Sequence, residues 1–204
     1  MKKSLMLLAA VALFATTPAF AAKGDKWIGI GGGASIPMSD LGDLVGTGWN
    51  GTAFFAFGMA PKIDLGVDVG YHAWSGKDNV ETPLGPVDLS DLKLTAIQAT
   101  PFLKYHLGSG AGKAAPYLKG GLGLYNVKEK LDAANVDEST SKFGFNVGGG
   151  VDWTVSPMYT IGINAAYHQI MLDDADKYPN KDGEAYNPSL VTVGVQLAWG
   201  MGKK

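Results

Sequence analysis

The chain has 204 residues, no cysteine, 29 glycines and a formal net charge of −2 at pH 7. Without cysteine it can form no disulfide, no thiolate metal site and no thiol nucleophile, and the small net charge argues against nucleic acid as a partner. Glycine is about twice as frequent as usual, but it does not follow the three-residue period of collagen.

The amino-terminal residues 1–21 have the features of a secretory signal peptide. Lys2 and Lys3 form a positive region, an apolar run covers residues 5–15, and residues 19–21 match the small-residue cleavage pattern. The apolar run is too short for a transmembrane helix, which needs about 20 residues. We therefore expect residues 1–21 to be removed on export and the mature chain to leave the cytoplasm.

Apolar and polar residues alternate with period two in segments of about ten residues along the mature chain. Several segments reach the roughly 9–11 residues that a tilted strand needs to cross a bilayer. The predicted strands are Trp27–Ile36, Trp49–Met59, Ile63–Trp74, Leu92–Leu107, Pro116–Lys130, Lys142–Val155, Tyr159–Gln169 and Ser189–Met201.

The fourth predicted strand does not keep one phase of alternation. Its apolar residues begin at the even positions Leu92 and Leu94 and continue at odd positions such as Ile97 and Leu103. We expect either a β-bulge near residues 95–96 or a strand that extends above the bilayer.

The predicted connections alternate between tight turns and longer polar loops. The turns cover residues 60–62, 108–115 and 156–158, and the loops cover residues 39–48, 75–91, 131–141 and 170–188. Short periplasmic turns and long extracellular loops are typical of outer-membrane barrels. An even number of strands then places both termini on the periplasmic side.

The apolar face of these strands could point inward, as in a soluble lipocalin-like barrel, or outward into lipid. We favour the outward orientation, because an eight-stranded barrel has little room for rows of large apolar side chains. Aromatic residues near the strand ends fit an interfacial girdle. The expected girdle consists of Trp49, Tyr71, Tyr105, Tyr159, Tyr167 and Trp199. Residues 22–204 are thus predicted to form an all-β domain, an eight-stranded antiparallel up-and-down transmembrane β-barrel.

Charged residues and all the histidines fall on the face predicted to line the lumen. The expected polar network consists of Asp64, Asp68, His72, Lys104, His106, Lys119, Asp152 and His168. It could form an ion pathway or a metal site, but we favour a plug of ion pairs, since an unpaired buried charge is costly. No metal-binding spacing is present, and we expect neither a metal nor a cofactor.

The predicted loops are acidic, and the last loop is the richest in carboxylates. Its candidates for contact with a divalent cation or lipopolysaccharide are Asp173, Asp174, Asp176, Asp182 and Glu184. Their spacing does not match an EF-hand, and a solvated loop surface is the simpler interpretation.

One pair of residues could suggest an enzyme. His72 and Ser75 could act as base and nucleophile near the outer rim, but no third member of such a site is evident and no G-x-S-x-G motif is present. We therefore expect no enzymatic activity.

Three segments resemble strand motifs of the small outer-membrane β-barrel domain family. Residues 115–124 (APYLKGGLGL) resemble its "PYLGAGLG" strand, residues 143–153 (FGFNVGGGVDW) its "FGYNAGAGVDY" strand, and residues 165–168 (AAYH) the close of the next strand. The family includes OmpA-, OmpX- and opacity-like barrels, and OmpW-like barrels are close to it in architecture. Two departures are the residues after Trp199, where many members end in an aromatic residue, and the lack of arginine.

The resemblance implies a location in the Gram-negative outer membrane, contact with its lipid and lipopolysaccharide, and insertion by the barrel-assembly machinery. We expect a non-enzymatic monomer with a structural or surface-interaction role through its extracellular loops. The alternative is an OmpW-like narrow transporter of small hydrophobic molecules. An apolar pocket among Phe54, Trp74 and the loop bases would favour transport, whereas a lumen closed by the charged network would favour the structural role.

Overall fold

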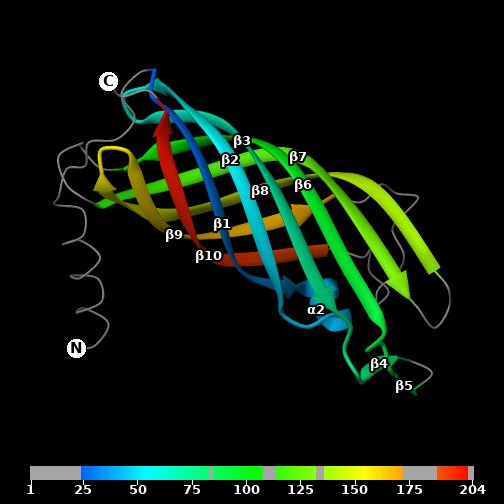
Figure 1. Ribbon diagram of the computed structural model, residues 1–204. Helices are drawn as coiled ribbons and strands as arrows, with labels where there is room; N and C mark the ends of the chain where they lie inside the picture. Colours follow the sequence, from blue (N-terminus) through cyan, green and yellow to red (C-terminus); the bar gives the residue numbers. More distant parts are fainter. Residues whose placement is uncertain (1–23, 83–84, 108–113, 132–135, 172–187, 202–204) are drawn as a thin grey trace, which may run out of the picture.

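The computed structural model describes residues 24–82, 85–107, 114–131, 136–171 and 188–201. The expected signal peptide and the acidic residues between positions 173 and 184 lie outside these ranges. The described chain forms a closed barrel of eight antiparallel strands, together with a short helix and a small hairpin at the loop end (Figure 1).

The barrel strands follow one another in chain order around the wall, and the first pairs with the last. They are β1 (Lys26–Met38), β2 (Gly48–Ala60), β3 (Ile63–Ser75), β6 (Leu92–His106), β7 (Ala114–Leu131), β8 (Val136–Ser156), β9 (Tyr159–Ile170) and β10 (Pro188–Met201). The helix α2 (Ser39–Leu44) follows β1, and β4 (Val80–Thr82) pairs with β5 (Gly85–Val87) between β3 and β6. This arrangement confirms the up-and-down barrel.

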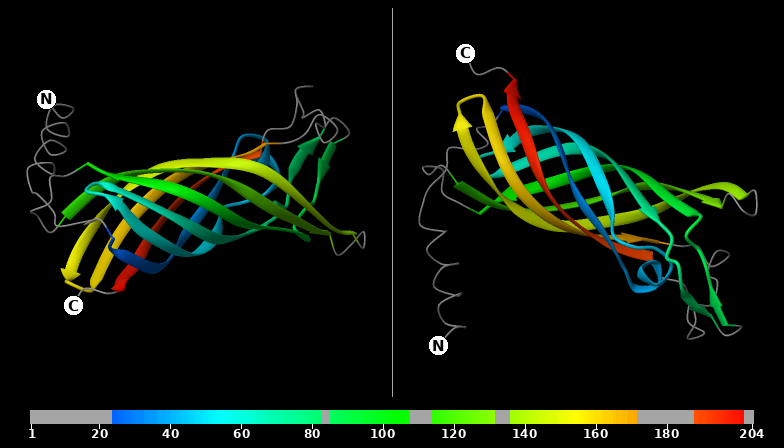
Figure 2. Two further views of the ribbon diagram at one scale, coloured as in Figure 1. Left: turned by 90° about the horizontal axis from the view of Figure 1, so that it is seen from above. Right: turned by 60° about the horizontal axis from the view of Figure 1, so that its bottom comes forward.

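The predicted ends of the barrel strands agree with the structure to within two residues, except at the start of β8. That strand begins at Val136 instead of Lys142, because its first residues pair with the end of β7 beyond the point where β9 stops. The yellow-green β7–β8 hairpin therefore reaches past its neighbours at the loop end (Figure 2). Its exposed residues are polar on both sides, so no alternation of apolar residues marks it as a strand.

The bulge expected near residues 95–96 does not form. From Lys93 to Tyr105, β6 pairs with β3 without a break, and its even-numbered residues face inward throughout. Leu92 and Leu94 are apolar because the interior itself is apolar near the loops, not because the strand changes phase. Register shifts occur elsewhere, beside two of the tight turns.

The outward face of the barrel is rich in large apolar side chains, as expected for a face in contact with lipid. Exposed examples from different strands include Ile30, Phe55, Val67, Ile97, Leu124, Val147, Ile163 and Val195. Of the expected girdle, Trp49, Tyr71, Tyr105 and Tyr159 are exposed, whereas Tyr167 and Trp199 are half-buried. No helix in the described part of the chain is long and apolar enough to cross a membrane.

Candidate functional site

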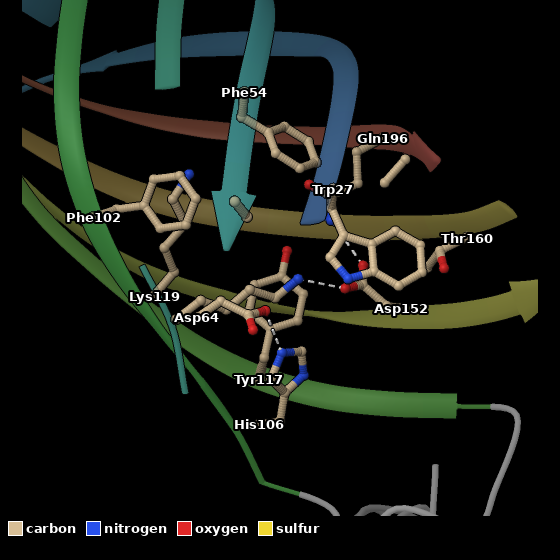
Figure 3. Close-up of a pocket in the computed structure, with 13 residues that line it drawn as sticks. Trp27, Phe54, Asp64, Phe102, His106, Tyr117, Lys119, Asp152, Thr160 and Gln196 are labelled. Carbon is tan, nitrogen blue, oxygen red and sulfur yellow. Dashed lines mark hydrogen bonds and ion pairs between the residues drawn. The ribbon is translucent and has the colours of Figure 1, made fainter. Parts of the chain in front are cut away.

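Three ion pairs lie inside the lumen between the tight turns and the middle of the barrel, each joining strands that are adjacent or two apart in the wall. The pairs are Asp64 with His106, Asp68 with Lys119, and Lys104 with Asp152. Asp64 Oδ2 lies 2.7 Å from His106 Nε2, and Asp152 Oδ2 lies 2.5 Å from Lys104 Nζ. Figure 3 shows Asp64, His106, Lys119 and Asp152, which come from the consecutive wall strands β3, β6, β7 and β8, around one pocket of the lumen.

The ion pairs do not join residues that lie directly opposite each other in the sheet. Lys104 is opposite Asp64 on one side and opposite Lys119 on the other. Because like charges in opposite positions repel, the two ammonium groups turn to different carboxylates, Lys104 to Asp152 and Lys119 to Asp68. Asp64 is left to His106, whose Nε2 lies within hydrogen-bond distance of its carboxylate.

Neutral groups complete the network. Asp68 accepts a hydrogen bond from Gln98 at 3.0 Å, and Asp152 accepts one from Gln196 at 2.7 Å. The ammonium groups of the two lysines lie 4.0 and 4.1 Å from the ring centres of Tyr117 and Phe102. These contacts offset part of the desolvation of the charges.

Glycine at position 162 makes room for one of these carboxylates. A Cβ atom added to Gly162 would overlap with Asp152 Oδ1 and would lie 3.0 Å from the Gln196 side chain. We expect Gly162→Ala to destabilise the barrel by about 1–3 kcal/mol through overpacking. Denaturant unfolding of the folded barrel measures this effect. Gly51→Ala is the matched control, because its Cβ would meet its nearest atom at 3.8 Å, and an equal loss in both variants would contradict the prediction.

The histidines divide between the two ends of the lumen. His72 and His168 lie near the loops with ring centres 5.5 Å apart, whereas His106 lies at the turn end beside Asp64. Hydrogen bonds join His72 Nδ1 to Ser35 Oγ at 3.3 Å and His168 Nδ1 to the Tyr125 hydroxyl at 3.1 Å. Within the described residues no group of three potential metal ligands converges.

The loop end of the lumen is closed by buried apolar side chains, a feature that the sequence pattern did not predict. This loop-side cluster consists of Leu41, Val45, Trp74, Leu92, Ala96, Tyr125, Ile170 and Leu190. Leu41 belongs to α2, which folds into the mouth of the barrel (Figure 1). The apolar residues at even positions of β6, Leu92 and Leu94, were the sequence signal that could have revealed this cluster.

Several polar contacts hold this cluster in place. Trp74 donates its indole N–H to the carbonyl of Ser35 at 3.1 Å and stacks on the His72 ring, with ring centres 5.6 Å apart. The Lys77 ammonium donates to the carbonyl of Gly42, and its backbone N–H donates to the carbonyl of Leu44 at 3.1 Å. The segment after β3 therefore fastens α2 over the lumen.

Two small cavities remain between the cluster and the turns, with volumes of about 40 and 60 Å³. Each has room for only a few water molecules. Phe54 lines both cavities, whereas Trp74 lines neither. The two residues are far apart along the barrel, because Phe54 lies opposite Asp68 and Trp74 is six residues further along β3. The apolar pocket that would have favoured transport does not form between these two residues.

The suggested pair of His72 and Ser75 does not come together. His72 is 1% exposed and faces the lumen, whereas Ser75 is exposed and lies an odd number of residues away on the same strand, so it faces the other side. The hydroxyl that does reach His72, that of Ser35, is fully buried beneath Trp74. Neither arrangement offers a nucleophile to a substrate at the rim.

Comparison with known proteins places this architecture in a family. A model of the outer membrane protein beta-barrel domain matches residues 6–198. No curated protein sequence matches the chain.

Solved structures share the fold at low sequence identity. Neisserial surface protein A is 17% identical with a TM-score of 0.58, over 85% of this chain and 96% of that chain. Ail, the attachment invasion locus protein of Yersinia pestis, is 16% identical with a TM-score of 0.55, over 88% and 100%. OprG from Pseudomonas aeruginosa is 15% identical with a TM-score of 0.56, over 92% and 99%. The chain therefore belongs to the outer membrane protein beta-barrel domain family and is a protein of the Gram-negative outer membrane.

Proposed function

We propose that this protein is a non-enzymatic barrel with a closed lumen that acts through its extracellular loops and outer surface. The observation that carries the proposal is the double closure of the lumen. The loop-side cluster closes the mouth, and the three ion pairs close the part below it.

The energetic cost of opening supports a barrel that stays closed. A passage along the axis would have to break buried ion pairs, and removing one partner of such a pair typically costs about 3–5 kcal/mol. It would also have to separate Trp74 from the apolar residues of α2 and expose these side chains to water. A fully open lumen would therefore be a rare state.

The part of the molecule beyond the membrane supports a surface role. The β7–β8 hairpin continues past the end of β9, and the β4–β5 hairpin adds a second projection at the same end (Figure 2). Regular structure outside the bilayer does nothing to span the membrane. It provides an ordered surface for contact with other molecules.

The competing proposal, narrow transport of small hydrophobic molecules, needs a pocket that a ligand can enter. The two cavities described above have room for only a few water molecules each. Transport would require α2 to leave the mouth, so opening of the loop-side cluster is the event that an experiment must detect.

Recordings in planar bilayers test the closed lumen. We expect the wild-type protein to show no stepwise conductance, and Asp68→Asn, which removes the charge partner of Lys119, to show at most brief openings. Asp78→Asn is the matched control, because Asp78 is exposed outside the barrel strands. Regular wild-type conductance steps that change in Asp68→Asn alone would overturn the proposal. Uptake of a small apolar dye by silent wild-type proteoliposomes would favour the transporter instead.

A further inference from the structure

Two buried histidines meet beneath the loop-side cluster. His72 on β3 and His168 on β9 are 1% and 4% exposed. Their rings meet edge to face, with ring centres 5.5 Å apart and an angle of 72° between the ring planes. Neither ring belongs to one of the three ion pairs. The two histidines are therefore a pair of titratable groups that the ion pairs of the lumen do not use.

The hydrogen bonds of His168 define its neutral form. The Thr192 hydroxyl lies 3.2 Å from His168 Nε2 and 3.4 Å from the carbonyl oxygen of Ala166. A carbonyl oxygen can only accept, so Thr192 donates its single proton to Ala166 and accepts from His168 Nε2–H. His168 Nδ1 then carries no proton and accepts from the Tyr125 hydroxyl, 3.1 Å away. A second proton on the ring would go to Nδ1 and turn this acceptor into a donor, so the hydrogen bond from Tyr125 would be lost.

Each histidine contacts one aromatic residue of the loop-side cluster. The Trp74 ring stacks on His72, with an angle of 8° between the ring planes. Tyr125 is fully buried, and its ring meets that of His168 edge to face with ring centres 6.2 Å apart. Trp74 and Tyr125 belong to the same cluster as Leu41 of α2. A displacement of either imidazole ring therefore reaches the residues that hold α2 in the mouth.

The polar side chains around the pair offer hydrogen bonds but no compensating charge. From β1, β2, β6, β8 and β10 these side chains are Ser35, Asn50, Gln98, Asn146 and Thr192. None of them ionises. A charge on either ring would be buried without a partner among them, which is unfavourable, and charges on both rings would also repel each other.

The described groups that can ionise near the pair are already engaged or lie away from it. Tyr125 on β7 bonds to His168, and Asp68 and Lys119 line the same cavity as the histidines but form an ion pair with each other. Asp68 is four residues from His72 along β3, about 13 Å at the usual rise of a strand. The carboxylates of α2 belong to residues that are not buried, since its buried residue is Leu41. The closed mouth therefore favours neutral imidazole rings.

We propose that His72 and His168 form an acid-sensitive switch that opens the loop end of the lumen when both rings take up a proton. In water an imidazole takes up a proton below about pH 6.5. An open mouth lets water reach the rings, so protons bind preferentially to the open state. Closure is thus complete above about pH 6.5 and weakens as the pH falls, by up to about tenfold in the opening equilibrium per pH unit for each histidine.

The switch concerns the mouth and not the ion pairs below it. The pairs of Asp68 with Lys119 and of Lys104 with Asp152 contain no histidine, and a proton on His106 only adds positive charge beside Asp64. Acid therefore opens the loop end without opening the whole lumen. The inference rests on the closed mouth of the proposed function, but not on the role of the loops.

The accessibility of a single thiol tests the switch, because the chain has no cysteine of its own. Val45→Cys places a thiol in the loop-side cluster at a residue that is 1% exposed, and Asp78→Cys places one at an exposed residue. Each full-length variant is treated in detergent with dithiodipyridine, which reacts with thiols at acidic and neutral pH. The rate for Val45→Cys divided by the rate for Asp78→Cys should rise at least about tenfold between about pH 7.5 and pH 5.

Histidine variants identify the groups that respond to acid. Adding both His72→Gln and His168→Gln to Val45→Cys removes the two titrating rings, so the relative rate should change less than about twofold over the same range. His106→Gln is the matched control, since His106 is the third histidine and lies at the turn end beside Asp64. It should leave the rise unchanged. Heat-modifiable migration on gels shows that each variant is folded.

The outcomes separate the switch from the closed mouth. A relative rate that stays low at both pH values would overturn the switch and leave the closure intact, and a rise that persists without His72 and His168 would also overturn the switch. Ala96→Cys, at a residue that is 2% exposed in the same cluster, repeats the measurement at a second place. If both thiols reacted as fast as that of Asp78→Cys already at pH 7.5, the closed mouth itself would be wrong.

Discussion

Asp152→Ala is expected to lower the free energy of unfolding by about 3–5 kcal/mol. The substitution leaves the Lys104 ammonium group without the carboxylate that lies 2.5 Å from it, and it also removes the acceptor of the Gln196 hydrogen bond at 2.7 Å. Asp152 is 3% exposed, so water cannot easily replace the lost carboxylate. Denaturant unfolding of the barrel in lipid vesicles, followed by tryptophan fluorescence, measures the change.

Two companion variants identify the cause of that loss. Asp78→Ala removes an exposed carboxylate and should change stability by less than about 0.5 kcal/mol. Combining Asp152→Ala with Lys104→Met removes both charges of the pair and should recover much of the stability, since replacing a whole buried pair by apolar groups is often neutral. If the double variant were as unstable as Asp152→Ala, an unpaired charge would not be the reason.

Trp74→Ala is expected to cost about 3–5 kcal/mol, the usual range for removing a large aromatic side chain from a packed core. Trp74 is 4% exposed within the loop-side cluster and also contacts Ser35 and His72. The substitution should leave a cavity beneath α2 and weaken the closure of the mouth. The free energy of unfolding measures the first effect, and protease sensitivity of the segment that contains α2 measures the second.

Trp49→Ala is the matched control, because Trp49 lies on the lipid-facing side and is 57% exposed. It removes the same side chain without touching the cluster, so α2 should keep its protection from protease. Equal losses of protection in the two variants would show that the cluster does not hold α2 in place.

The local pattern of the sequence was enough to predict most of the fold. Period-two alternation and turn residues depend on nearest neighbours in the chain, so they indicate where β3 or β9 begins and ends without reference to the rest of the barrel. The first residues of β8 were not predicted, because a two-stranded ribbon outside the membrane has no apolar face. The interpretation of Leu92 and Leu94 was wrong, because the interior does not have one polarity along its whole length.

The residues of the polar network were predictable, but their partners were not. The alternation along each strand is sufficient to place Asp68, Lys104 and Asp152 on the inner face. Asp64 and Lys104 lie directly opposite each other in the sheet, but each forms its ion pair with another residue. Partner choice depends on the repulsion between Lys104 and Lys119 and on which nearby strand each side chain can reach inside the lumen.

The sequence by itself thus determined the number of barrel strands, their order and the face that meets lipid, because those properties follow from alternation along each strand. Only the tertiary structure decided that α2 turns into the mouth and which residues of the polar network pair with one another. The physical reason is that barrel closure brings together residues far apart in the chain. Their contacts depend on the register and tilt of every strand, which no single segment contains.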